Sequence, residues 1–291
     1  MSSVPAATIR ATERPSILIE PTRGWASLRL REVWAYRELI YFFVWRDVKV
    51  RYKQTVLGVT WAVLQPLMTT VVFSVFFGRL ANIGSDGLPY PLFCFAGLLP
   101  WSFFAQGLNQ SSSSLVGSSN LISKVYFPRL VIPISSVLLG LIDLTVTSLL
   151  LVGMMAYYRV WPSATFLLLP FFVLLAAGAA LGIGLWLSAL NVKYRDVRYI
   201  VPFFVQMWLF ASPVIYPASR VTAKLESAGI PVWLYGLNPM AGVVQGFRWA
   251  ALGTGPALGS VIATSAFVTA VLLIGGAFYF RSVERTFADI V

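Results

Sequence analysis

The feature that most constrains this chain is a series of long apolar segments with almost no charge inside them. A helix needs about 20 apolar residues to cross a bilayer core of roughly 30 Å. Six segments are candidates, at residues 56–80, 91–113, 130–157, 165–190, 200–216 and 256–280, and the fifth is the shortest. None alternates polar and apolar residues, so they predict helices and not barrel strands. We therefore expect an all-α integral membrane protein with six transmembrane helices.

Composition excludes several classes of protein. The chain is 58% hydrophobic and 11% charged, which fits no soluble class. Its net charge of +11 lies in clusters at the ends of apolar segments, which does not favour nucleic acid as a partner. Cys94 is the only cysteine, and there is no histidine, so a disulfide within the chain, a cysteine metal cluster and most zinc sites are excluded. No cofactor or metal is expected to bind this chain.

The distribution of Lys and Arg predicts the orientation. If the six segments alternate in direction, 17 of the 22 basic residues fall on the side that holds both termini. Cytoplasmic loops carry the excess of positive charge in membrane proteins, so both termini are expected in the cytoplasm. Residues 1–24 contain no continuous apolar core and are expected to be a cytoplasmic tail, not a cleaved signal peptide.

Residues 25–53 precede the first span and contain an amphipathic pattern. Apolar side chains recur at steps of three and four, broken only by Arg37, at Leu30, Val33, Trp34, Tyr41, Val44, Trp45 and Val48. The opposite side carries Arg31, Glu32, Glu38 and Lys49. This periodicity predicts a helix that lies on the membrane surface or packs on a soluble partner.

The segment between the fifth and sixth spans is apolar but interrupted by prolines. Asn238-Pro239 reads as an N-cap followed by proline at the first helical position, which predicts a helix from Asn238 to about Leu252. That helix is too short to span comfortably, so we expect short helices that dip into the outer leaflet, with a seventh full span as the alternative. In the fourth span, Gly178 and Gly182 predict close helix packing, more within one chain than between two.

The chemistry available to this chain is sparse. Asp143 is the only acidic residue in the six spans, which disfavours an ion-coupled transporter and leaves pairing with a neighbouring helix or a direct role in transport. No GxxxxGK[ST] phosphate loop, HExxH or GxSxG motif occurs, so any ATP hydrolysis belongs to another subunit. A membrane-bound glycosyl- or acyltransferase would need catalytic carboxylates or histidine that the sequence lacks, so no enzyme is expected.

Aromatic residues make up 15% of the chain, and many lie inside the spans. Lipid-facing bulk and interfacial belts account for some of them. Sugar rings have apolar C–H faces that stack on aromatic planes, so an aromatic pore with few charges would suit a neutral glycan. The spans carry these candidates for contact with a glycan: Trp61, Phe73, Phe76, Trp101, Phe104, Phe204 and Trp208.

Six ordered blocks resemble the ABC-2 type permeases that export polysaccharides. They are RDVKVRYK at 46–53 with TVLG at 55–58, Trp61 and Gln65-Pro66, AGLLPW at 96–101, NLISKVYFPR at 120–129, RDVRY at 195–199, SPVIY at 212–216, and LNPM at 237–240 with GFR at 246–248. The resemblance extends from about Trp25 to the C-terminus, and it leaves residues 1–24 outside.

The resemblance implies an ABC-2, or type V exporter, fold over residues 54–291, with an interface helix before it and short re-entrant helices on the outer side. It implies a homodimer with two ATP-binding cassette subunits, which would hold the ATP and magnesium. The complex would export a polyprenyl-diphosphate-linked glycan, such as O-antigen, capsule or teichoic acid, across the bacterial inner membrane. A lipid or a drug is the alternative substrate of such a permease.

The resemblance also assigns residues. The segment 117–129 matches the part that touches the ATPase, with Asn120, Lys124, Tyr126, Phe127 and Arg129 as its contact residues. The pore would be lined by the first, second and fifth spans, which hold the aromatic candidates named above. Four cations before the first span are candidates for the carrier diphosphate or for simple positive-inside anchoring: Arg46, Lys49, Arg51 and Lys53.

Overall fold

The computed structural model describes residues 30–53, 59–122, 124–253 and 259–284, and these form helices and turns without a strand. The helices are α1 (Leu30–Ala35), α2 (Arg37–Lys53), α3 (Val59–Phe73), η1 (Ser74–Leu80), α4 (Tyr90–Gly117), α5 (Ser119–Ile122), α6 (Val131–Tyr157), η2 (Ala164–Leu168), α7 (Leu169–Lys193), α8 (Val197–Ala211), α9 (Ala218–Ser227), η3 (Val232–Leu237), α10 (Pro239–Leu252) and α11 (Gly259–Val283).

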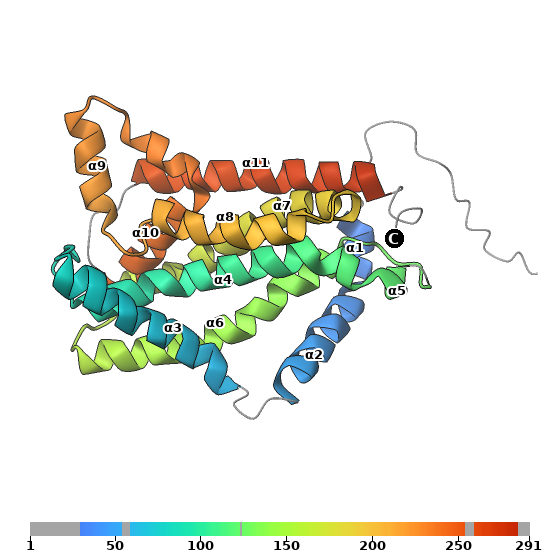
Figure 1. Cartoon of the computed structure of the whole chain (residues 1–291), viewed down its shortest axis with the longest axis horizontal. Helices are drawn as coiled ribbons and strands as arrows, with labels where there is room; N and C mark the ends of the chain where they lie inside the picture. Colours follow the sequence, from blue (N-terminus) through green and yellow to red (C-terminus); the bar gives the residue numbers. More distant parts are fainter. Residues whose placement is uncertain (1–29, 54–58, 123, 254–258, 285–291) are drawn as a thin grey trace, which may run out of the picture.

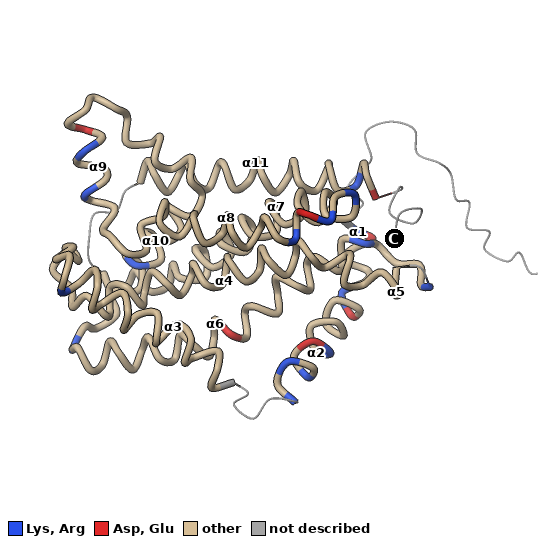
Figure 2. Tube along the Cα trace, in the orientation of Figure 1, with Lys and Arg blue, Asp and Glu red and all other residues tan. Residues whose placement is uncertain are grey.

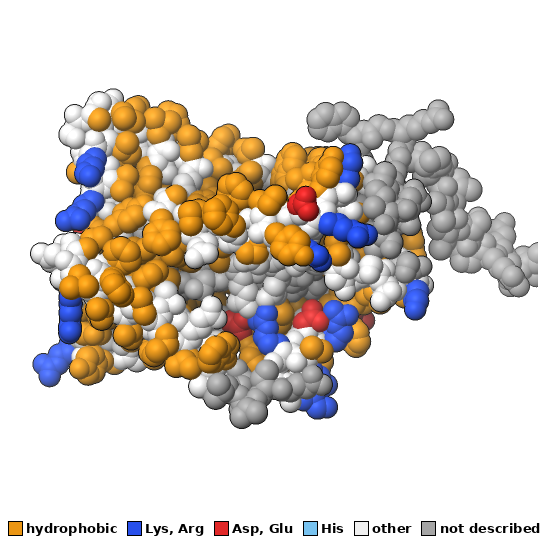
Figure 3. Space-filling model, viewed as in Figure 1, with side chains coloured by type: hydrophobic (Ala, Val, Ile, Leu, Met, Phe, Trp, Pro, Cys, Tyr) orange, Lys and Arg blue, Asp and Glu red, His pale blue; other side chains and the backbone are white. Residues whose placement is uncertain are grey.

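The long helices lie side by side and run between two ends of the bundle (Figure 1). We call these the α5 end and the α9 end, after the short helices found there. The charged residues gather near these two ends and along α2, while the long helices between them carry few (Figure 2). Hydrophobic side chains cover most of the face seen in Figure 3. An apolar flank between two charged ends is the surface that a bilayer requires.

Five of the six predicted spans are confirmed as helices long and apolar enough to cross a membrane: Thr60–Leu80, Tyr90–Gly117, Val131–Tyr157, Ala164–Lys193 and Gly259–Val283. The remaining predicted span, the fifth at residues 200–216, corresponds to α8, which has 15 residues and is therefore about 22 Å long. It runs between the two ends of the bundle and packs on α4 and α7 (Figure 1). The prediction extended this span to residue 216, but the helix ends before Ser212-Pro213, because proline cannot continue the backbone hydrogen bonding.

The core is built around α4. In its spanning window 78% of the residues are buried, compared with 6% in the window of α3. Phe93, Phe95 and Phe104 of α4 are fully enclosed. The α7 helix packs on α11 at the predicted glycine pair, where a Cβ on Gly182 would lie 2.7 Å from the backbone nitrogen of Leu273. These glycines therefore serve packing within one chain, as predicted.

The amphipathic region before the first span is two helices and not one, because the chain turns at Tyr36 between α1 and α2. Phe43 of α2 is buried in a second core at the α5 end. The aromatic residues of the predicted apolar pattern do not share this contact, since Trp34, Tyr41 and Trp45 are exposed. One face of α2 thus packs on the chain itself, while these three aromatic side chains lie outside.

The interrupted segment forms α9, η3 and α10 at the α9 end, as predicted. The side chain of Asn238 accepts a hydrogen bond from the backbone N–H of Met240 at 3.0 Å, which confirms the N-cap. The helix ends at Leu252, before Gly253 in a left-handed conformation with φ 67°. With 14 residues, α10 is about 21 Å long, and among the described residues it is not one of the helices long and apolar enough to cross a membrane, so the alternative of a seventh full span is not found there.

Candidate functional site

A cluster of polar side chains joins the end of α2 to α4 and α6. The carboxylate of Asp143 in α6 accepts hydrogen bonds from Arg51 Nη1 at 2.6 Å, from Gln106 Nε2 of α4 at 2.7 Å, and from the hydroxyl of Tyr52. We call these four residues the Asp143 cluster. Burial, followed by the hydrogen bond to Asp143, raises the pKa of Tyr52 to about 12. Tyr52 is therefore a neutral donor near pH 7.

This cluster accounts for the one acidic residue in the predicted spans. The Asp143 side chain is 14% exposed, and a carboxylate in that setting is costly unless it is paired and hydrogen-bonded. The prediction that it pairs with a neighbouring helix is confirmed. Its cation comes from α2, which the spacing of residues could not reveal. Gln110, with its amide oxygen turned toward Arg51, extends the network by accepting from Gln106 at 3.1 Å.

The four cations predicted for a carrier diphosphate have different surroundings. Arg51 belongs to the Asp143 cluster, and Arg46 Nε donates to Asp47 at 2.8 Å. The ammonium of Lys49 lies 5.1 Å from the ring centre of Trp45 and is exposed, as is Lys53. Lys49 and Lys53 are thus the two that stand open at the end of α2.

The segment predicted to touch an ATPase lies at the α5 end. Asn120 belongs to α5, and Lys124 and Tyr126 are exposed, with 90% of Tyr126 accessible. Phe127 has the opposite orientation: it is buried, and its ring meets that of Phe43 edge-on, with centroids 5.9 Å apart. The loop therefore presents Tyr126 outward and is fixed to α2 through Phe127.

Arg129 ties the same segment to Glu284, which directly follows α11. Its backbone nitrogen donates to the carboxylate of Glu284 at 3.2 Å, and its guanidinium donates to the Glu284 carbonyl. Arg281 pairs with Glu284 as well and lies 3.9 Å from Glu32 of α1. The loop, α1 and the end of α11 are thus joined at the α5 end.

The seven aromatic candidates fall into two groups. Trp61, Phe76 and Phe204 are exposed, and they lie on α3, η1 and α8. The other four are packed inside or against the core: Phe73, Trp101, Phe104 and Trp208. Phe104 is the centre of that packing, with ring centres 5.4 Å from Trp101 and 5.3 Å from Trp208. In this conformation Trp101 and Phe104 could reach a ligand only if the helices around them separated.

Sequence reasoning missed a buried hub near the α9 end. The guanidinium of Arg248, in α10, stacks 3.7 Å from the ring centre of Phe93 and donates to the carbonyls of Phe93, Pro213 and Val214 at 2.9–3.2 Å. Gly97 leaves room for it, since a Cβ there would clash with Arg248 Nη2. Three of the six sequence blocks named above therefore meet at one arginine, a contact that no local pattern indicates.

Known proteins match this chain over most of its length. The sequence profile of the ABC-2 type transporter family matches residues 38–252, from α2 through α10. An O-antigen export system permease protein of Myxococcus xanthus is 32% identical over 220 residues, which cover 75% of this chain and 82% of that protein. One from Klebsiella pneumoniae is 26% identical over 87% of this chain and 95% of that protein. A polysialic acid transport protein of Escherichia coli is 24% identical over 69% of this chain and 76% of that protein.

A profile that covers more than two thirds of the chain, together with a relative above 30% identity, decides the family. The all-helical fold and its spanning helices agree with it. The chain belongs to the ABC-2 type transporter family.

Proposed function

We propose that this chain is the membrane subunit of an ABC exporter of polysaccharide, of the O-antigen kind, driven by a separate ATPase subunit. The observation that carries the proposal is the long alignment with two proteins named O-antigen export permeases, over 75% and 87% of this chain. The lack of a phosphate-loop motif in the sequence agrees with hydrolysis by a partner.

The transport path would lie between two copies of the chain in the cytoplasmic membrane, with the termini inside. The support is the outward face of α3 and η1, whose spanning window is only 6% buried, and the exposed Phe203 and Phe204 of α8. Trp61 and Phe76 on this face offer flat apolar surfaces to sugar rings. Charge is nearly absent there, which suits a long glycan that must slide without being held.

Coupling to the ATPase would begin at the exposed Tyr126. Its neighbour Phe127 contacts Phe43, so a displacement of the loop is passed directly to α2. From α2 the motion passes through Arg51 to Asp143 in the middle of α6, and thus into the bundle. A rigid ring contact and a charge-assisted hydrogen bond transmit displacement better than a mobile loop does. Lys49 and Lys53, exposed at the same helix, would attract the carrier diphosphate.

The test is co-purification of the full chain with its candidate ATPase subunit, followed by an ATPase assay in lipid with and without polyprenyl-linked glycan. We expect a complex of two membrane and two ATPase subunits whose hydrolysis rises with the glycan. A deletion strain should accumulate polyprenyl-linked glycan inside the cell. A strain with normal glycan export but altered drug sensitivity would instead favour the drug or lipid permease.

A further inference from the structure

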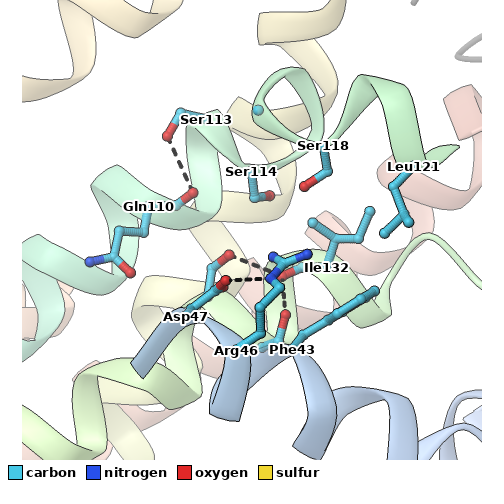
Figure 4. A pocket seen from close by; sticks show the side chains of 12 residues that line it. Phe43, Arg46, Asp47, Gln110, Ser113, Ser114, Ser118, Leu121 and Ile132 are labelled. Carbon is cyan, nitrogen blue, oxygen red and sulfur yellow. Dashed lines mark hydrogen bonds and ion pairs between the residues drawn. The ribbon is translucent and has the colours of Figure 1, made fainter. Parts of the chain in front are cut away.

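A polar cleft of about 250 Å³ lies between α2, the end of α4 and the start of α6. Figure 4 shows Arg46 and Asp47 rising from α2 toward the end of α4, with Gln110, Ser113 and Ser114 on the opposite side. Ser135 and Ser136 of α6 also line the cleft. The cleft adjoins the Asp143 cluster through Gln110, and it adjoins the ring contact of Phe127 through Phe43, because both residues line it.

The serines of this cleft present acceptors. Four of their hydroxyls donate to carbonyls of their own helix: Ser113 and Ser114 in α4, and Ser135 and Ser136 in α6. Each hydroxyl proton is thereby used, and the oxygen lone pairs remain for a ligand. With the carboxylate of Asp47 they favour a ligand group that is rich in N–H or O–H donors.

Arg46 gives the same cleft a positive group. Its bond to Asp47 uses Nε, and among the described residues neither Nη nitrogen has a hydrogen-bond acceptor. A guanidinium with two such nitrogens is suited to a phosphate. One wall of the cleft thus carries a site for an anion beside a site for a cation, which is the charge pattern of a zwitterion.

The surroundings of the cleft favour a lipid over a soluble ligand. The helix that forms its wall, α2, exposes three large aromatic side chains, those of Tyr41, Phe42 and Trp45, and Trp34 of the preceding α1 is exposed as well. Exposed aromatic residues with lysines and arginines among them are typical of a helix in the interfacial layer of a bilayer. A head group in the cleft would therefore have its acyl chains beside an apolar surface.

We propose that this cleft binds the head group of a zwitterionic phospholipid with a primary ammonium, phosphatidylethanolamine by chemistry. The phosphate would pair with Arg46, and the ammonium would donate its three N–H bonds to Asp47 and serine oxygens. The bound lipid would brace α2 against α4 and α6, next to the loop that holds Tyr126. The site requires the membrane but does not depend on export of a polysaccharide, and a carrier diphosphate would lack the ammonium.

Binding is measured by native mass spectrometry of the full chain, purified in detergent and depleted of lipid. Phosphatidylethanolamine, phosphatidylglycerol and phosphatidylcholine with identical acyl chains are added separately. The glycerol head group has no cation and the choline head group has no N–H donor, so we expect phosphatidylethanolamine to bind about tenfold more tightly than either. Equal retention of the three lipids by the wild-type chain would overturn the proposal.

The sequence provides a matched control, because Arg-Asp-Val occurs at residues 46–48 and again at residues 195–197. Asp47→Asn should weaken phosphatidylethanolamine about tenfold and leave phosphatidylglycerol unchanged, while Asp196→Asn should alter neither. Ser114→Phe, which fills the cleft, is the second variant and should lose the same lipid. Retention of phosphatidylethanolamine by both cleft variants refutes the site, and equal binding of free glycerophosphoethanolamine refutes the lipid as its source.

Discussion

Breaking the bond between Arg51 and Asp143 should loosen α2 from the bundle. Removal of one partner of a buried ion pair costs about 3–5 kcal/mol. Here Arg51 is 31% exposed and can regain water, so we expect about 2–3 kcal/mol for Arg51→Gln or Asp143→Asn alone. The double variant leaves no unpaired charge and should cost about as much as either single variant. The coupling energy then equals the cost of one single variant, about 2–3 kcal/mol.

The assay is a double-mutant cycle on the purified chain, unfolded in mixed micelles by increasing detergent denaturant and followed by tryptophan fluorescence. The control is the Arg46–Asp47 pair, whose side chains are 44% and 31% exposed and whose removal should cost at most about 1 kcal/mol. If the Arg51 and Asp143 variants add within about 0.5 kcal/mol, they act independently, and the Asp143 cluster does not anchor α2.

Three further predictions concern other parts of the chain. Phe127→Ala should destabilise the fold by about 3 kcal/mol because the ring is buried. Tyr126→Glu should leave the free energy of unfolding unchanged and abolish co-purification with the ATPase. If both variants were as stable as the wild-type chain and still co-purified with the ATPase, the coupling role of the loop would be contradicted. Gly97→Ala should displace Arg248 and lower the stability of the fold by about 1–3 kcal/mol. It should therefore aggregate on heating at a lower temperature than the control Gly84→Ala, where a Cβ would have no atom within 4 Å. The pKa of Tyr52 is higher in the folded chain than in the unfolded chain, so its contribution to the free energy of unfolding is complete below about pH 10 and is lost as pH rises through about 12. The free energies of unfolding of the wild-type chain and of Tyr52→Phe, measured against pH, should therefore converge there.

The spans could be predicted from sequence because lipid allows few solutions. A backbone in hydrocarbon must satisfy its own hydrogen bonds, so a long apolar segment is a helix almost regardless of its neighbours. Asn238-Pro239 and Gly253 likewise determine the limits of α10 through local hydrogen bonding and backbone geometry. The break at Tyr36 and the early end of α8 were missed, because a helix boundary depends on how the chain leaves it.

The orientation of side chains could not be predicted, because apolar residues inside a membrane protein and apolar residues facing lipid have the same composition. Trp101 and Trp61 look alike in sequence, yet one is 4% exposed and the other 56%. The family resemblance, by contrast, was readable from short blocks alone and is confirmed.

The sequence by itself determined that most of this chain lies in a membrane, where its spans are, to which family it belongs and that it lacks an ATP-binding motif. All of these depend on local residue patterns. Only the tertiary structure decided that Asp143 pairs with α2, that Phe127 lies against Phe43, and that Arg248 joins three distant blocks. The contacts of Phe43 with Phe127, of Arg51 with Asp143 and of Arg248 with Phe93 join residues 84 to 155 positions apart. Such pairs are set by how helices pack, and helix packing has no signature in any single segment.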